Sequence, residues 1–389
     1  MLWSSVRAFA HKPAGKSPKC RGPVTSSSAA TPAVVRIIRT GPRGLANPTS
    51  EFASLLSTVK DAGLLRRRRL FYILTFATIA VAMGGAWVGF ALLRNTWYEL
   101  LIAGVLGVLL TQFAFLAHEA SHRQIWESGK VNDHTGRLIA DLLVGISYSW
   151  WMTKHSRHHA APNTVDRDPD IEPDFIVFQE KHARGLKGIS AKLATRQGWL
   201  FFPALTLEGL NLHVQAFKTV FSRGRVERRS TEIVLLSVRN IGYLAVVFSL
   251  LPIGMAFAFL GVQLAVFGVY MGASFAPNHK GMPMIPKEEK VDFLRRQVLT
   301  SRNIRGGFGM NIFMGGLNYQ IEHHLFPSMP RPHLKRASEI VREYCAARDI
   351  HYTQADLFES YGIVIDYLNR VGLMARDPFD CPAAQAAGR

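Results

Sequence analysis

Histidines gathered in three short clusters are the residues of this sequence whose types and spacing could do chemistry. The clustered histidines and one isolated companion are His118 and His122 in HEASH, His155, His158 and His159 in HSRHH, His323 and His324 in QIEHH, and His279 in APNHK. On a helix, residues four apart share a face, so two such rings can reach one metal ion. Neutral imidazole suits iron, zinc, copper and nickel, and eight rings exceed the three or four protein ligands of one zinc ion. The pattern therefore predicts two metal ions.

Four apolar stretches must position these clusters. They cover residues 70–93, 100–117, 233–251 and 254–276, and they are uncharged except for Arg239. Their lengths suit membrane-spanning helices, and the short connections predict two hairpins. The run of four arginines at 66–69 keeps the N-terminus in the cytoplasm. Each hairpin returns the chain to that side, so both termini and every histidine cluster are expected there. The predicted fold is an all-α, multi-pass membrane protein with a cytoplasmic helical cap that holds the metals.

Shorter segments are expected to build the cap. Residues 138–151 are apolar and end in two tryptophans, as an interfacial helix does. Residues 199–217 are apolar too, and a further membrane span is the alternative there. Residues 332–347 and 353–372 have the pattern of amphipathic helices of a soluble region.

The ends of the chain differ from the middle. Residues 1–50 contain eight basic residues and no acidic one, which indicates a disordered extension, a misassigned upstream start codon or a transit peptide. Residues 377–389 are expected to form a loose tail, which leaves 51–376 as one domain. The net charge of +18 is concentrated in the extension and beside the first apolar stretch, so nucleic-acid binding is excluded as a function. Three scattered cysteines exclude a disulfide scaffold.

The first histidine cluster also fits a different chemistry. HEASH matches the H-E-x-x-H pattern of zinc metalloproteases, with Glu119 as the general base, and it follows a membrane span as in intramembrane proteases. That hypothesis needs only His118 and His122 and leaves five clustered histidines without a role. A non-catalytic metal carrier is a third class, but it would not need a large apolar cap between the hairpins.

Taken together, HEASH, HSRHH and NYQIEHHLFP resemble the histidine boxes of the membrane fatty-acid desaturase family, over about residues 70–345. Gln320 heads the third box, where many members carry histidine, and in this the chain is similar to the front-end and linoleoyl-type branch. Members of that branch often carry a fused cytochrome b5 domain. This chain has no His-Pro-Gly-Gly haem motif. The resemblance then implies a separate electron donor, namely a ferredoxin, a cytochrome b5 or a flavoprotein reductase.

The resemblance also implies the site. It implies O2-dependent desaturation of a fatty acyl-CoA or a membrane lipid at two iron ions. The residues in the ligand positions are His118, His122, His155, His158, His159, His279, His323 and His324, with Gln320 in the place of the remaining ligand. A lipid hydroxylase or ketolase would need the same irons and is the alternative activity.

Three further sets of residues are expected around the metals. Acceptors for the second ring nitrogen of the ligands are expected among Glu119, Asn163, Asp166, Asp168, Asp170, Asn278 and Glu322. Residues that could line an acyl tunnel are Trp150, Trp151, Phe308, Met310, Phe313 and Met314. Residues that could bind the phosphates of the substrate head group are Lys154, Arg157, Arg302 and Arg305.

Overall fold

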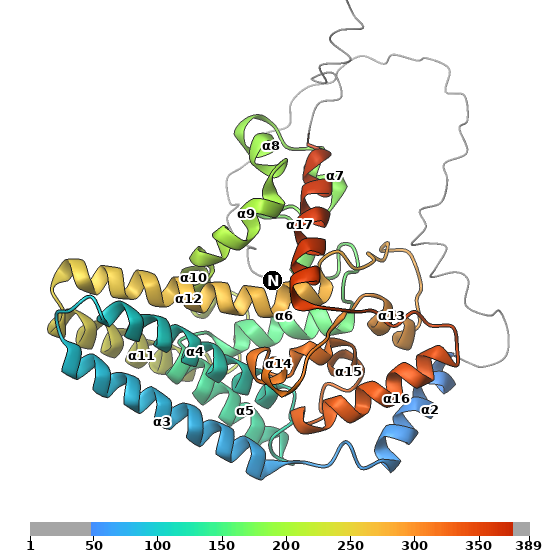
Figure 1. Cartoon of the computed structure of the whole chain (residues 1–389), viewed down its shortest axis with the longest axis horizontal. Helices are drawn as coiled ribbons and strands as arrows, with labels where there is room; N and C mark the ends of the chain where they lie inside the picture. Colours follow the sequence, from blue (N-terminus) through green and yellow to red (C-terminus); the bar gives the residue numbers. More distant parts are fainter. Residues whose placement is uncertain (1–47, 376–389) are drawn as a thin grey trace, which may run out of the picture.

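The computed structural model describes residues 48–375 and is almost entirely helical in that range (Figure 1). The two strands of the described residues form one parallel pair, in which β1 (Asn303–Ile304) lies beside β2 (Gln354–Ala355), and a single isolated bridge joins Thr164 to Ile285. The expected tail at 377–389 and most of the expected extension at 1–50 lie outside the described residues. The last three residues of that extension belong to helix α2 (Pro48–Asp61).

Four helices are long and apolar enough to cross a membrane. They are α3 (Arg69–Leu93), α4 (Glu99–Ser121), α11 (Arg229–Leu250) and α12 (Ile253–His279), and they coincide with the four predicted stretches. Two of them extend beyond the apolar sequence. Helix α4 continues to Ser121 and α12 continues to His279, so the first histidine cluster and the isolated histidine lie in or directly after these helices.

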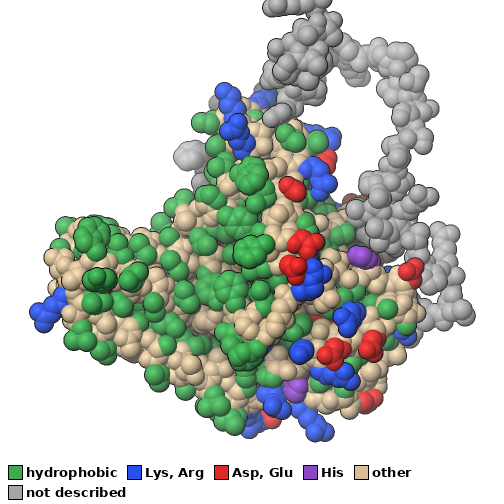
Figure 2. All heavy atoms as spheres, viewed as in Figure 1, with side chains coloured by type: hydrophobic (Ala, Val, Ile, Leu, Met, Phe, Trp, Pro, Cys, Tyr) green, Lys and Arg blue, Asp and Glu red, His purple; other side chains and the backbone are tan. Residues whose placement is uncertain are grey.

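The four long helices lie at one end of the molecule (Figure 1). Helix α4 packs against both α3 and α12. Gly107 allows the close approach to α12, because a Cβ atom there would lie 2.8 Å from the carbonyl oxygen of Gln263. Phe90 of α3 and Phe259 of α12 meet edge to face at 5.2 Å between ring centroids. Figure 2 shows hydrophobic side chains over this end of the visible face, whereas charged side chains gather over the opposite end.

The chain between α4 and α11 forms short helices, none of which spans a membrane. They are α5 (Gly129–Arg137), the π-helix η1 (Leu138–Val144), α6 (Tyr148–Ala160), η2 (Pro169–Ile171), α7 (Glu180–Ala183), α8 (Gly188–Ala194), α9 (Gln197–Ala204), η3 (Leu205–Leu207) and α10 (Glu208–Val220). The expected single helix over 138–151 is wrong, because Gly145 adopts a left-handed conformation and ends η1. The alternative span over 199–217 is also wrong, because the helix changes to a 3₁₀ turn at Leu205.

The chain after α12 completes the cap. Its helices are α13 (Phe293–Leu299), α14 (Phe308–Phe313), η4 (Leu317–Tyr319), α15 (Gln320–Leu325), η5 (Arg331–His333), α16 (Leu334–Ala346) and α17 (Leu357–Leu373). The two amphipathic helices predicted near the C-terminus are α16 and α17. Helix α2 packs against α13 and α16, so the first described residues close over the third histidine cluster.

Candidate metal centre

The structure brings all eight predicted histidines into one buried cluster that divides into two groups. The larger group consists of His118, His122, His155, His159 and His323, and the smaller group consists of His158, His279 and His324. Within each group the nearest ring nitrogens all lie within 4.8 Å of one another. Gln320 adjoins the smaller group, with its side-chain amide nitrogen 2.9 Å from Nε2 of His279.

The first cluster occupies the C-terminal end of α4. The helix ends at Ser121, whose hydroxyl donates to the carbonyl of His118 at 2.6 Å. His122 is the capping residue, and its backbone N–H still bonds to the carbonyl of His118. The two rings therefore stay on one face, as the spacing predicted, with ring centroids 4.8 Å apart.

Helix α6 carries the second cluster and begins where its sequence dictates. Ser147 caps the helix by accepting from the backbone N–H of Trp150 at 3.1 Å. Asp141 accepts from the backbone N–H of Tyr148 at 2.8 Å, which ties η1 to the first turn of α6. Histidines three and four residues apart then lie along one side of α6 and face both groups.

The third cluster lies in α15, after a tight turn. Gly315 and Gly316 both have positive φ, and a Cβ atom on Gly315 would lie 2.3 Å from the ring of Phe115. Glycine is therefore required there, both for the backbone conformation and for the approach to α4. Helix α15 is buried along its whole length, so His323 and His324 face the cluster rather than solvent.

The arrangement of ring nitrogens fits a bound cation. Nε2 of His155 lies 3.0 Å from Nε2 of His118 and 2.7 Å from Nε2 of His122. A neutral imidazole carries one N–H, so three converging nitrogens cannot all be satisfied by hydrogen bonds to one another. Nε2 of His324 is buried and has no hydrogen-bond partner among the described residues. Metal coordination would satisfy these nitrogens.

Burial keeps most of these rings in the form that binds metal. It lowers the pKa of His122 to about 3. Burial, together with neighbouring histidines, also lowers the pKa values of His155, His159, His323 and His324 well below the ordinary value. These rings are therefore neutral at pH 7, and neutral imidazole is the ligand form.

His158 differs because it is held by carboxylates. Burial lowers its pKa, but Asp168 and Asp170 outweigh that effect and raise the pKa above the ordinary value. Nδ1 of His158 lies 3.0 Å from Asp168, so its proton points to the carboxylate. Nε2 is then left to face His279, at 3.3 Å. Asp168 is itself fixed by the backbone N–H groups of Asn163 and Asp170.

Two other rings are oriented by groups that the sequence did not reveal. Nδ1 of His279 donates to the backbone carbonyl of Thr300 at 2.9 Å. Nδ1 of His324 lies 2.9 Å from Oε1 of Gln297, whose amide donates to the carbonyl of His159. A backbone carbonyl leaves no trace in a sequence, and Gln297 has no distinguishing neighbour.

Five of the seven predicted acceptors bond to groups other than a ring nitrogen of the cluster. Glu119 binds Arg331 and the hydroxyl of Tyr72. Glu322 accepts from Asn303 and Tyr352. The remaining three side chains also find partners other than a ring nitrogen: the Asn163 amide donates to the carbonyl of His279, Asn278 donates to Gln320, and the exposed Asp166 pairs with Lys181. Of the seven predicted acceptors, Asp168 and Asp170 lie at a ring nitrogen.

The predicted head-group residues are largely engaged by the protein itself. Arg302 is 1% exposed and donates to the carbonyls of Pro277 and Lys280, so its assignment to a head group is wrong. The other three form ion pairs: Lys154 with Asp170, Arg157 with Glu172, and Arg305 with Asp356 and Glu359.

The predicted tunnel residues separate by location. Trp151 stacks on the ring of His155, with centroids 4.7 Å apart. Trp150, Met310 and Met314 belong to the apolar core beneath the histidines. Phe308 is 81% exposed, and Phe313 is partly exposed and stacks on Tyr270, so neither lies against the metal cluster.

The fold and the site together define a helical protein with four membrane-length helices and a cluster of eight histidines that could hold metal ions. The family model described as fatty acid desaturase matches residues 95–356. The chain belongs to the fatty acid desaturase family, and it is therefore an oxidoreductase.

Characterised desaturases align over most of the chain. A Delta(8)-fatty-acid desaturase of Arabidopsis thaliana is 28% identical over 340 residues, which cover 84% of this chain and 76% of that protein. A Delta(6)-fatty-acid desaturase of Caenorhabditis elegans is 28% identical over 82% of this chain and 74% of its own length. A Delta(5) fatty acid desaturase of the same organism is 29% identical over 83% and 74%. These matches remove the basis for the metalloprotease hypothesis, which also needed Glu119 free of its ion pair with Arg331.

Proposed function

We propose that this protein desaturates a fatty acyl chain with O2 at a centre of two iron ions. The observation that carries the proposal is the division of eight imidazoles, six of them buried and two half-buried, into a group of five and a group of three. Gln320 stands beside the group of three, so each group offers at least four side chains to a metal. An amide oxygen is a weaker ligand than imidazole, and that of Gln320 accepts from Asn278, so Gln320 would bind a metal weakly or through a water molecule.

Iron bound in these groups would supply the oxidising power that acid–base side chains lack for removing hydrogen from an unactivated methylene. The chain's own residues orient and shield the site. Asp168, the carbonyl of Thr300 and the amide oxygen of Gln297 each fix one ligand ring through its second nitrogen. This directs the remaining nitrogen of each ring toward the cluster centre.

An aromatic wall on one side of the cluster is suited to an acyl chain. Trp151 lies 5.9 Å from the ring of His118 and 6.0 Å from the ring of Phe275, measured between centroids. A cavity of only about 10 Å³ adjoins this wall and is lined by Gly272, Phe275 and His279, with the charged Asp170 and Lys280 on its border. We infer that methylene groups lie against this wall, from which apolar rings exclude water.

The same geometry supports a proposal for the membrane arrangement. We infer that α3 with α4 and α11 with α12 form two hairpins, because five and two residues join the helices of each pair. His118 and His279 lie at the C-terminal ends of α4 and α12, which therefore reach the same side of the membrane. The four arginines at 66–69 support a cytoplasmic location for that side, and we propose the same location for both termini and the cap.

The named relatives place double bonds at positions 5, 6 and 8 counted from the carboxyl end. We propose an acyl-CoA or acyl-lipid substrate that is desaturated on the carboxyl side of its chain. Electrons come from a separate protein, a ferredoxin, a cytochrome b5 or a flavoprotein reductase.

Expression in a host that lacks such an activity, followed by fatty-acid methyl ester analysis, tests the proposal. We expect a new unsaturated acid in cells that express the wild type and none with His323→Ala at equal protein level. The purified protein should contain about two irons per chain, since the two histidine groups each suit one ion. One zinc ion and no iron, or a hydroxylated product in place of an alkene, would overturn it.

A further inference from the structure

We propose that an anionic phospholipid binds in a groove between α3 and η1, with its phosphate in an arginine cleft at the start of α3 and one acyl chain along α3. This lipid is not the substrate. The binding site stands apart from the histidine cluster, and the proposal does not depend on the reaction that the cluster catalyses.

The polar half of the site is a cleft of about 670 Å³. Its lining consists of Leu65, Arg66, Arg67, Arg69 and Glu127. Glu127 pairs with Arg69, so three arginines face one carboxylate and the cleft keeps an excess of positive charge. Arg67 is fixed by a hydrogen bond to the carbonyl of Ser328 at 2.8 Å, which holds this part of the arginine run against the cap.

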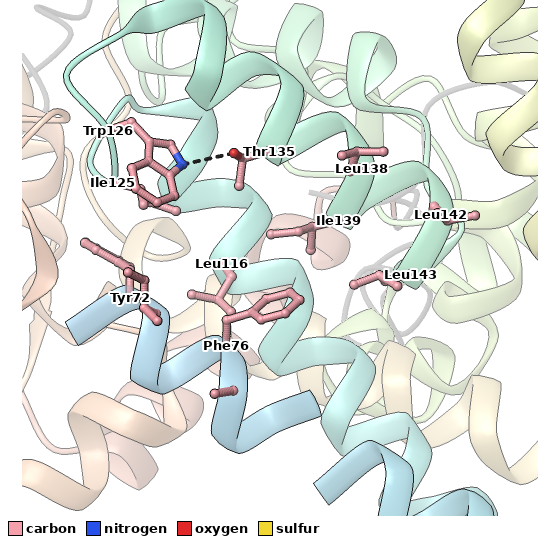
Figure 3. A pocket seen from close by; sticks show the side chains of 12 residues that line it. Tyr72, Phe76, Leu116, Ile125, Trp126, Thr135, Leu138, Ile139, Leu142 and Leu143 are labelled. Atoms are coloured by element: carbon pink, nitrogen blue, oxygen red, sulfur yellow. Dashed lines mark hydrogen bonds between the residues drawn. The ribbon is translucent and has the colours of Figure 1, made fainter. Parts of the chain in front are cut away.

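The apolar half begins one helical turn further along α3. A cavity of about 440 Å³ opens between Tyr72 and Phe76 of α3 and Leu138, Ile139 and Leu142 of η1 (Figure 3). A second cavity, of about 550 Å³, continues in the same direction as far as Trp87. Phe76, Leu142 and Leu143 line both cavities, so the two are adjacent, and we infer that they act as one groove, whose far end also contacts Arg239 and Gln263.

The dimensions and charges of the groove match a phospholipid. Arg69 and Met83, which line the cleft and the second cavity, are 14 residues apart on α3, or about 21 Å. The hydrocarbon layer of one bilayer leaflet is about 15 Å deep, so the groove can hold a full acyl chain. Phosphate complements the arginines directly, and arginine binds phosphate more specifically than lysine does.

The groove opens toward lipid rather than toward the metal cluster. Ile73 is 50% exposed and Leu138 is 51% exposed along its rim. A second acyl chain can therefore remain in the bilayer, as a diacyl lipid requires. None of the eight clustered histidines is among the residues that line either cavity.

The groove nevertheless touches the residues that connect α4 with the loop after α15. The hydroxyl of Tyr72 contacts Gln124 at 3.0 Å and accepts from the backbone N–H of Arg331 at 3.0 Å. A lipid packed against Tyr72 and bound at Arg66 would hold α3 against this loop. Bound lipid is therefore expected to stabilise the folded protein.

The arginine run alone would follow from membrane topology, so the test needs a matched control. Arg223 and Arg225 are exposed and lie just before α11, and neither lines the groove between α3 and η1 or the arginine cleft. Removing these two arginines lowers the net charge by as much as removing Arg66 and Arg69 does, and near the same end of the long helices. Ile241 of α11 is 69% exposed and lines neither cavity, so it serves as the control for a bulky substitution.

The experiment measures lipid binding to the purified, delipidated full chain by native mass spectrometry, with phosphatidylglycerol as the probe. We expect one tightly held lipid per chain and weaker binding of phosphatidylcholine. The double variant Arg66→Gln, Arg69→Gln should bind phosphatidylglycerol about 30-fold more weakly, at about 1 kcal/mol per arginine. Leu142→Trp fills the groove and should weaken binding about tenfold by displacing about two methylene groups. The variants Arg223→Gln, Arg225→Gln and Ile241→Trp should bind as the wild type does.

Several outcomes would overturn the proposal. If the Arg66, Arg69 variant and the Arg223, Arg225 variant lost equal affinity for phosphatidylglycerol, the lipid would be bound by general surface charge and not by this cleft. Displacement of the lipid by glycerol 3-phosphate would identify a simple phosphate site, and displacement by an equimolar acyl-CoA would identify a substrate site. Because binding is measured without turnover, failure of the proposed desaturase activity would leave this result unaffected.

Discussion

The buried ion pair between Glu119 and Arg331 provides the sharpest test of how the histidine site is built. Glu119 lies in the first histidine cluster, and Arg331 follows the third. Nε of Arg331 lies 2.7 Å from Oε1 of Glu119, a second nitrogen binds Oε2, and both side chains are at most 4% exposed. Removing one partner of such a pair leaves a buried charge, which typically costs about 3–5 kcal/mol.

The perturbation is a double-mutant cycle. Arg331→Met leaves the carboxylate of Glu119 buried with only Tyr72 as a partner, so we expect destabilisation by about 3–5 kcal/mol. Glu119→Gln keeps an acceptor oxygen and the shape of the side chain, so the expected loss is about 1.5–3 kcal/mol. The double variant removes both charges and should be more stable than Arg331→Met alone, with a coupling energy of at least about 2 kcal/mol.

Unfolding in mixed micelles with increasing dodecyl sulfate, followed by tryptophan fluorescence, measures the three stabilities. Fatty-acid profiles and iron content are measured on the same preparations. Glu119→Gln should retain part of the activity and show reduced iron occupancy, because the ends of α4 and α15 become less firmly held.

Two results would refute this reasoning. Additive losses in the double variant would mean that the two charges do not interact. Complete loss of product in Glu119→Gln, with both irons and full stability retained, would give Glu119 a direct role in proton transfer instead of a role in holding the site together.

Three further predictions concern single residues. His323→Ala should remove iron and product, whereas the exposed His134→Ala should change neither; a fully active His323 variant would contradict the ligand assignment. Asp168→Asn should lower metal affinity or activity about 10–100-fold by releasing the ring of His158, and unchanged iron content and activity would argue against this role. Burial raises the pKa of the Cys345 thiol to about 12, so at pH 8 only about one thiol in 10⁴ is ionised. Iodoacetamide should therefore label Cys345 only after unfolding, as peptide mass spectrometry can show, and rapid labelling of the native protein would be inconsistent with its burial.

The sequence predicted the parts of this protein whose signals are local. Four long apolar stretches, read by length and hydropathy, correspond to α3, α4, α11 and α12. The three histidine clusters were found because spacings of three and four residues place side chains on one helical face. The family was recognised from the same clusters, and the match over residues 95–356 confirms it.

What the sequence could not predict depends on distant contacts. The division into groups of five and three separates His158 from His159, which are neighbours in the chain and lie in different groups. The partner of Glu119 is 212 residues away. Arg302 was expected to bind a head group, but its guanidinium donates hydrogen bonds to the carbonyls of Pro277 and Lys280 at the C-terminal end of α12. The type of a side chain alone does not reveal whether it is buried.

Ring nitrogens without hydrogen-bond partners affect the stability of the site. Nδ1 of His155 and of His159 and Nε2 of His324 are buried without a hydrogen-bond partner among residues 48–375. A buried, unsatisfied polar group costs about 1–3 kcal/mol. Of these three atoms, Nε2 of His324 is the one that faces the cluster, because Nδ1 of that ring lies at Gln297 and the rings of His155 and His159 face the cluster through Nε2. Nε2 of His324 would regain its loss on binding metal, so metal and cap should stabilise each other. Ile321 and Leu325 of α15 pack in the same apolar cluster as Cys345, on the side of α15 away from the histidines. The helix that presents His323 and His324 is therefore held from one side by this core, and a bound metal would hold it from the other.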